Sequence, residues 1–163
     1  MKGRGKGLMF LLAAVAITAA IGNGCAPAQA AQLNVVKPPI ADRDLVIEIS
    51  EITENVIFYP VDIDGVRIEV LAVKAPDGTI RTAFNTCQAC HGSGRAFFKQ
   101  TGTVLVCQNC NQRFRMGQVG VRSGGCNPVP IFPQNTKISD GTITIPKDFL
   151  KEARPIFVRW KRV

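Results

Sequence analysis

The chain has 163 residues, the length of one ordinary domain and too short for a large multidomain enzyme. Its composition is 46% hydrophobic and 20% charged, as in globular proteins, so wholesale disorder and collagen-like repeats are excluded. Lysine and arginine number 20 against 12 acidic residues, which gives a net charge of +8. Six cysteines are more than packing usually needs, and five of them lie between Cys87 and Cys126, so we look for the chemistry there.

The first 25 residues have the organisation of a secretory signal. Three basic residues precede an uncharged apolar run over residues 8–21, and small residues follow. As a helix this run is about 21 Å long, shorter than the roughly 30 Å hydrocarbon core, which favours a cleaved signal over an uncleaved anchor. Because Lys2, Arg4 and Lys6 are its only charges, its removal lowers the net charge from +8 to +5. We therefore expect an exported protein, periplasmic or on the outer face of the cell membrane, with no nucleic-acid partner.

Two processing sites compete at the end of this segment. Ala28-Gln29-Ala30 fits ordinary signal cleavage, whereas Gly22-Asn23-Gly24-Cys25 resembles a bacterial lipoprotein box in which Gly22 replaces the usual branched residue. The second alternative is slightly favoured, and it makes Cys25 a lipidation site that tethers the protein to the membrane. Residues 26–43 have no period and are rich in alanine, glutamine and proline, so they are predicted as a linker before a domain over residues 44–163.

The domain is predicted to be mainly β. Alternating or β-prone runs predict strands at residues 45–49, 56–60, 66–70, 80–84, 96–99, 103–106, 142–145 and 156–160. Asp64-Gly65 and Asp77-Gly78 are typical of hairpin turns. Pro146-Lys147-Asp148 predicts the start of a short helix that ends at Ala153. We therefore expect a small antiparallel-sheet domain with a short C-terminal helix. Basic and apolar residues alternate over 154–162, which is typical of a half-buried final strand and not of a nucleic-acid site.

Four cysteines form two C-x-x-C pairs, each directly after a predicted strand. Cys87-Gln88-Ala89-Cys90 and Cys107-Gln108-Asn109-Cys110 are sixteen residues apart, and the hairpin predicted between them gives a ribbon-like double-knuckle spacing. A C-x-x-C turn points both sulfurs at one position, so two turns complete a tetrahedron around one soft cation. We therefore predict a shared metal or cluster site at Cys87, Cys90, Cys107 and Cys110.

Several alternatives remain open for the cysteines. In an oxidising compartment the pairs could form disulfides, or one pair could serve a thiol–disulfide oxidoreductase. Cys87-Gln88-Ala89-Cys90-His91 also fits the C-x-x-C-H attachment sequence of c-type haem, although haem would leave Cys107 and Cys110 without a role. Cys126 follows two glycines and is a free buried thiol, a fifth ligand or a redox-active thiol beside the tetrathiolate. No Ser/His/Asp set or carboxylate pair supports a hydrolase.

The cysteine motifs occur in a specific order. Asn85-Thr86-Cys87-x-x-Cys90 is followed by Val106-Cys107-Gln108-Asn109-Cys110 and by Gly124-Gly125-Cys126-Asn127-Pro128-Val129-Pro130, with Asp64-Gly65 and Asp77-Gly78 ahead of them. From Leu45 to Phe157 this order resembles the FtrD-like membrane iron–sulfur-containing protein family. The resemblance implies a bacterial protein associated with iron uptake. It also implies that five cysteines hold an iron–sulfur centre or metal, namely Cys87, Cys90, Cys107, Cys110 and Cys126.

The chain departs from that family in two respects. It has one signal-like segment where several relatives have a membrane domain, and it has His91 where tyrosine or glycine is common. We expect a non-enzymatic, exported, membrane-tethered protein that acts in iron handling or electron transfer. The expected cofactor is an iron–sulfur cluster or a single iron or zinc ion, with haem c less favoured. The expected partners are the membrane surface, through the N-terminal anchor, and membrane components of an iron-uptake or redox system.

Overall fold

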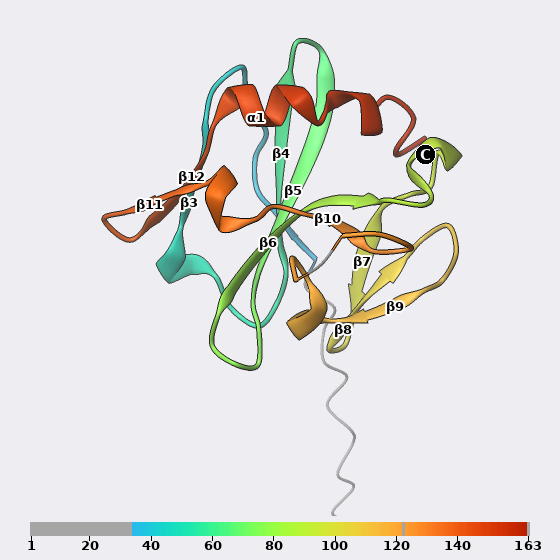
Figure 1. The fold of residues 1–163 in the computed structure, drawn as a ribbon, viewed down its shortest axis with the longest axis horizontal. Helices are drawn as coiled ribbons and strands as arrows, with labels where there is room; N and C mark the ends of the chain where they lie inside the picture. The colour runs from blue at the N-terminus through green and yellow to red at the C-terminus, as the bar shows by residue number, and fades with distance from the viewer. Residues whose placement is uncertain (1–33, 122, 163) are drawn as a thin grey trace, which may run out of the picture.

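The computed structural model describes residues 34–121 and 123–162, which form three β-sheets and one short α-helix (Figure 1). The largest sheet has six strands in the order β1-β4-β5-β6-β10, and β2 also pairs with β4. β1 and β2 run parallel to β4, and the other neighbours are antiparallel. The strands are β1 Val35–Val36, β2 Ile40–Ala41, β4 Ile57–Ile63, β5 Val66–Lys74, β6 Ile80–Cys87 and β10 Pro128–Pro130.

Two antiparallel sheets of three strands complete the fold. In Figure 1 the sheet β11-β12-β3 lies at the left and the sheet β7-β8-β9 at the lower right, while α1 (Lys147–Glu152) crosses β4 and β5. The strands of these sheets are β3 Leu45–Glu48, β11 Lys137–Ser139, β12 Thr142–Ile145, β7 Phe98–Thr101, β8 Val104–Cys107 and β9 Arg113–Arg115. The prediction of a mainly β domain with antiparallel sheets and a short C-terminal helix is confirmed.

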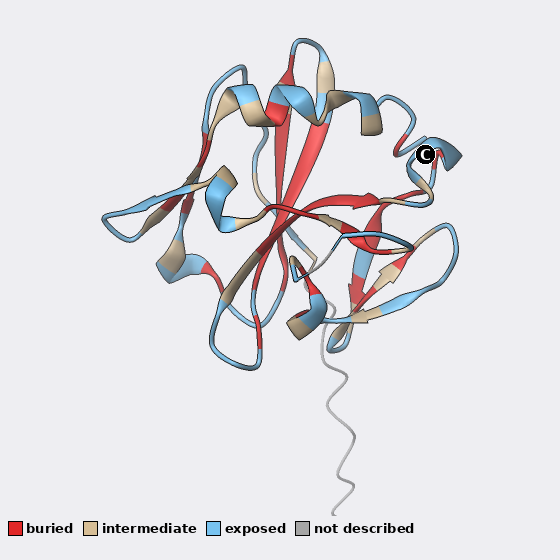
Figure 2. Cartoon of the chain, viewed as in Figure 1, coloured by how far each residue is buried: buried red, intermediate tan, exposed pale blue. Residues whose placement is uncertain are grey.

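The hairpin β4–β5 forms the centre of the hydrophobic core. Most of its side chains are buried on both faces of the sheet, and Figure 2 shows the buried residues concentrated along β4, β5 and β6. Branched residues such as Val61, Ile68 and Val70 are fully buried in this centre, as expected for strands covered on both sides. β6 is therefore held firmly in the core up to its last residue, Cys87, which is also fully buried.

Both predicted turns join neighbouring strands of the main sheet. Asp64-Gly65 connects β4 to β5, and its residues have positive φ angles of 46° and 77°, as a type I′ turn requires. Asp77-Gly78 lies in the loop between β5 and β6, where the Asp77 carboxylate accepts a hydrogen bond from the backbone N–H of Thr79 at 3.0 Å. These local signals explain why β4, β5 and β6 are consecutive antiparallel neighbours.

The strand predicted over residues 156–160 is wrong. The chain there forms the short 3₁₀ helix η5 (Arg154–Ile156), followed by turns over residues 157–159. In a strand Phe157 and Trp160 would face opposite sides, because they are three residues apart, yet both are buried. Val158 between them is 66% exposed. Burial thus follows the spacing of a helical turn and not the alternation of a strand. The two aromatic rings pack edge to face with their centroids 5.1 Å apart, which stabilises this compact end of the chain.

Part of the predicted linker, residues 26–43, belongs to the main sheet. β1 and β2 add to the edge of β4, and the backbone N–H of Lys37 donates to the carbonyl oxygen of Phe58 at 2.8 Å. A strand of two residues shows no period, so the sequence pattern could not predict it. Sheet structure consequently begins before the predicted start of the domain at residue 44. The signal segment and Cys25 lie outside the described residues.

Gly120 lies against β6 in a conformation that other residues rarely adopt. Its φ is 67°, and a Cβ atom at this position would lie 2.9 Å from the carbonyl oxygen of Thr82. We expect Gly120→Ala to lower the free energy of unfolding by about 1–3 kcal/mol, because the positive φ and the backbone contact both oppose a side chain. Gly92→Ala is the matched control, since a Cβ atom at Gly92 meets nothing within 4 Å. Chemical denaturation compares the two variants, and equal stabilities would contradict this packing.

Candidate metal centre

Two strands of different sheets end at the cysteine motifs. β6 ends at Cys87 and β8 ends at Cys107, so each C-x-x-C pair occupies the turn after a strand, as predicted. The predicted hairpin between the pairs is β7–β8. The backbone N–H of Cys87 donates to the carbonyl oxygen of Ala96, and that of Gln108 donates to the carbonyl oxygen of Phe97, both at 2.8 Å. Because Ala96 and Phe97 are consecutive, these bonds place the two knuckles side by side.

Four thiols converge on one point beside these turns. The sulfurs of Cys87, Cys90, Cys110 and Cys126 all lie within 4.8 Å of one another. Cys87 is buried, Cys90 and Cys126 are half-buried and Cys110 is exposed, so the set extends from the core to the surface. It contains both cysteines of the first pair, the second cysteine of the second pair, and the cysteine whose role the sequence left open.

Cys126 reaches this set because the strand that follows it belongs to the main sheet. β10 pairs with β6 and brings the preceding loop beside Cys87. Within this loop the carbonyl oxygen of Asn127 accepts the backbone N–H of Gln88 at 3.1 Å, and the Gly124 N–H donates to the Gln88 side-chain oxygen. β10 was not predicted from the sequence, because each proline of Pro-Val-Pro lacks the backbone N–H that a sheet strand uses.

Cys107 was expected in the tetrathiolate, but it lies beside the four-thiol set and not within it. It is fully buried at the end of β8 and hydrogen-bonds to the Cys110 thiol. The backbone N–H groups of Asn109 and Cys110 act to lower the pKa of Cys107, and those of Ala89 and Cys90 act in the same way on Cys87. The five cysteines of the domain therefore form one connected group, in which Cys107 is the thiol that lies outside the set of four.

The protein environment opposes ionisation of most of these thiols. Burial raises the pKa of Cys87 and of Cys107, and a hydrogen bond with Cys110, together with burial, raises the pKa of Cys126. Burial also acts to raise the pKa of Cys110, but hydrogen bonds from the Gln112 backbone N–H and from neighbouring thiols outweigh it and lower this pKa. A soft cation would supply the positive charge that converging thiolates require, so the cluster is suited to metal binding.

Comparison with known proteins identifies the family. Residues 52–157, almost two thirds of the chain, match the family model described as membrane iron-sulfur containing protein FtrD-like. The chain belongs to the FtrD-like family. This confirms the resemblance found in the sequence, and the five cysteines of the cluster all lie within the matched range. No curated protein and no solved structure matches the chain.

The family description and the cysteine cluster together support binding of a metal or an iron–sulfur centre. The description also supports a membrane location for this FtrD-like chain. Among residues 34–121 and 123–162, no helix has the length and hydropathy needed to cross a bilayer.

A buried polar network joins the strands that carry the two knuckles of the FtrD-like domain. Asn85 is 1% exposed, and its side chain donates to the Glu69 carboxylate at 2.6 Å and accepts the backbone N–H of Phe98 at 2.8 Å. Phe98 lies opposite Cys107 in the β7–β8 pair, so Asn85 links β6 to the second knuckle. The indole N–H of Trp160 donates to the Asn85 carbonyl oxygen. This role of Asn85 was not predicted from the sequence, in which the residue is only part of a motif.

His91 does not belong to the set of side chains that converge beside the first C-x-x-C pair. His91 is exposed in the 3₁₀ helix η2 (His91–Ser93), and its Nδ1 donates to the carbonyl oxygen of Gln88 at 3.0 Å. Cys87 is fully buried beside the other thiols. Convergence of thiols from three chain segments favours thiolate ligation over covalent haem, and also over a single dithiol used for disulfide exchange.

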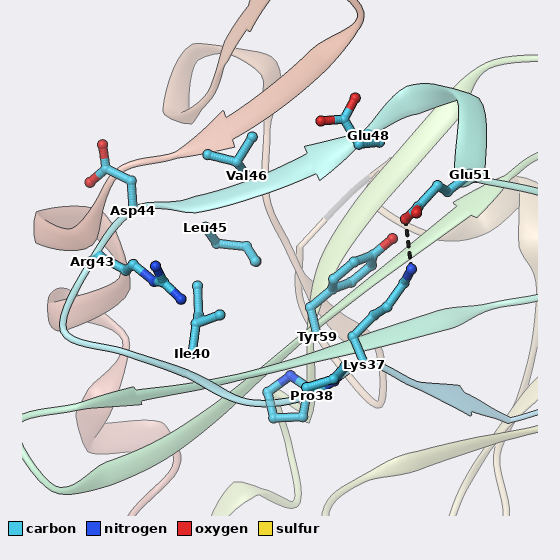
Figure 3. Close-up of a pocket in the computed structure, with 11 residues that line it drawn as sticks. Lys37, Pro38, Ile40, Arg43, Asp44, Leu45, Val46, Glu48, Glu51 and Tyr59 are labelled. Atoms are coloured by element: carbon cyan, nitrogen blue, oxygen red, sulfur yellow. Dashed lines mark hydrogen bonds and ion pairs between the residues drawn. The ribbon is translucent and has the colours of Figure 1, made fainter.

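A separate hollow of about 350 Å³ lies between β3 and the β1–β2 segment (Figure 3). An ion pair between Lys37 and Glu51, 2.7 Å long, lies at its edge beside Tyr59. Burial, followed by the charge of Glu51, raises the pKa of Tyr59 to about 12. Basic and acidic side chains both line this hollow, and it contains no cysteine. Its mixed charges select no single class of ligand, so the cysteine cluster is the candidate functional site.

Proposed function

We propose that this FtrD-like chain is an exported, membrane-tethered protein whose cysteine cluster holds an iron–sulfur centre or a single iron or zinc ion. The observation that carries the proposal is the convergence of four thiols within 4.8 Å in a member of an iron–sulfur family. The proposed role is iron handling or electron transfer together with membrane components of an iron-uptake or redox system. The N-terminal segment tethers the chain to the membrane, through lipidation of Cys25 or as an anchor.

The donor set fits soft metal ions. Thiolates favour zinc, iron and iron–sulfur clusters over hard cations such as Mg²⁺ and Ca²⁺. A tetrahedral ion about 2.3 Å from each sulfur places the sulfurs roughly 3.8 Å apart, which is compatible with the 4.8 Å limit found here. A cluster distributes the thiolates over several iron atoms and requires the sulfurs to separate further. When bound, an iron centre supplies one-electron redox chemistry.

Each residue of the centre has a distinct place in this proposal. Buried Cys87 would hold the inner side of the metal or cluster and exposed Cys110 its outer side, and half-buried Cys90 and Cys126 would complete the set. Cys107 supports Cys110 through their hydrogen bond and is available as a fifth thiolate. Backbone N–H groups of both knuckles favour the thiolate forms of Cys87 and Cys107, and they would tune the reduction potential of an iron centre held there.

Anaerobic purification of the full chain tests the proposal. We expect the protein to contain tightly bound iron or zinc, measured by metal analysis together with acid-labile sulfide and with visible and paramagnetic resonance spectra. Iron with a matching amount of sulfide identifies a cluster, and iron without sulfide identifies a single ion. Zinc without iron would exclude electron transfer as the function and leave metal handling. A protein that is isolated without metal and binds neither added Fe²⁺ nor Zn²⁺ would contradict the proposal.

A further inference from the structure

The charge of this protein is distributed very unevenly along the chain. Residues 78–139 contain seven lysines and arginines but no aspartate or glutamate, and all five cysteines of the cluster lie in this segment. The acidic residues are confined to the segments before and after it. Removing the signal segment therefore leaves a positive charge that is concentrated in the part of the chain that builds the metal centre.

The β7–β8–β9 sheet gathers part of this charge on one face. Lys99, Val106 and Arg113 are opposite one another across the three strands, and Thr101, Val104 and Arg115 form the next row on the same side. The opposite side of this sheet packs into the core. We call the outward side the basic face, defined by Lys99, Thr101, Val104, Val106, Arg113 and Arg115.

The charges of the basic face are available to a partner. Lys99, Arg113 and Arg115 are exposed, and none of them forms an ion pair with another residue that the structure describes. Lys161 adds to them, because the Nζ atoms of Lys161 and Lys99 lie 4.9 and 5.8 Å from the centre of the Phe97 ring. All ion pairs within residues 34–121 and 123–162 are formed by residues outside the basic face.

The basic face borders the exposed edge of the cysteine cluster. β8 and β9 are joined by the turn that carries Cys110, the exposed thiol of the four. Arg113 begins β9 only three residues after Cys110. These basic side chains are on the outward side of the sheet, whereas Cys107 and its neighbour Leu105 are buried, so the charges do not serve to neutralise buried thiolates.

We propose that the basic face docks an acidic surface of a partner protein beside the cysteine cluster. The purpose of the docking, exchange of electrons or of a metal ion at the Cys110 edge, rests on the function proposed above. Half-buried Val104 and Val106 lie between the charged side chains and match the apolar middle of a protein interface with a charged rim. Complementary charge steers such a partner and orients it toward the cluster.

A protein surface fits this face better than a membrane does. Binding in the interfacial region of a bilayer uses exposed aromatic or large aliphatic side chains beside the basic residues. The large hydrophobic side chains that are exposed within the described residues are Val35, Val36, Val46, Val121, Ile138 and Val158, and none of them belongs to the basic face.

The test measures binding of the purified full chain to a poly-glutamate peptide by calorimetry at low and at physiological ionic strength. Backbone amide shifts of Val104, Val106 and Cys110 report where the peptide binds. We expect the triple variant Lys99→Glu, Arg113→Glu, Arg115→Glu to bind at least about tenfold more weakly, with the difference reduced by salt. Metal content is measured separately on every variant, so failure of docking and failure of metal binding are distinguishable.

The matched control replaces three exposed basic residues elsewhere, Arg43, Lys74 and Lys137, with glutamate. It therefore changes the net charge by the same amount as the basic-face variant. Lys74 lies at the far end of the β5–β6 hairpin from Cys87, about 23 Å along the strand. We expect this control to bind the peptide nearly as the unmodified chain does. Equal weakening in both triple variants would overturn the proposal, because binding would then depend only on net charge. Tighter and equally variant-sensitive binding to phosphatidylglycerol vesicles would overturn it in favour of a membrane contact.

Discussion

The Cys126→Ala variant is expected to lose its metal. The sulfur of Cys126 is one of four that lie within 4.8 Å of one another, and the fifth described thiol, Cys107, does not belong to this set. We expect the metal affinity to fall by more than about 100-fold, beyond the 10–100-fold effect of groups that only support ligands. Competition with a chromophoric chelator measures this affinity on the anaerobically purified protein.

Cys107→Ala is the matched comparison, because it removes a thiol of the same group that lies outside the four-thiol set. We expect this variant to retain the metal, with an affinity reduced by no more than the roughly 10–100-fold typical of groups that only support ligands, because it loses the interaction with Cys110. The reverse result, loss of metal in Cys107→Ala and retention in Cys126→Ala, would restore the double C-x-x-C site predicted from the sequence. Loss in both variants would identify a centre with five thiolates.

Asn85→Ala is expected to lower the free energy of unfolding by about 2–4 kcal/mol. The substitution leaves the buried carboxylate of Glu69 and the backbone N–H of Phe98 without their hydrogen-bond partner, and each unsatisfied buried group costs about 1–3 kcal/mol. It also removes the bond between β6 and β7, so we expect weaker metal binding as a second effect. Chemical denaturation of the metal-free and metal-loaded protein separates the two effects.

Two further variants make this experiment specific. Asn109→Ala removes an exposed asparagine within the second knuckle and is expected to change the stability by less than about 0.5 kcal/mol. The double variant Asn85→Ala, Glu69→Ala removes both members of the side-chain hydrogen bond, so its destabilisation should be less than the sum of the single effects by about 1 kcal/mol or more. Additive effects of the two substitutions would show that this network does not hold the strands together.

Local signals predicted the three central strands of the main sheet, β4, β5 and β6, and both knuckles. Alternation in Val66, Ile68 and Val70 identified β5, and Asp64-Gly65 identified the turn before it, because period and turn chemistry act over a few residues. The same is true of the strands that end at Cys87 and Cys107. Phe157 and Trp160 misled the prediction, since a short apolar segment with basic neighbours has the same composition in a strand and in a helical turn.

The sequence by itself determined the chemistry available to this protein: a mainly β domain of the FtrD-like family with five thiols in two C-x-x-C turns and one glycine-flanked loop. Only the tertiary structure decided which four thiols converge, because that depends on β10 pairing with β6 across about forty residues of chain. It also decided that Lys99, Arg113 and Arg115 lie on one face of the β7–β8–β9 sheet beside those thiols. Pairing between distant strands sets both results, and no local pattern of residues encodes it.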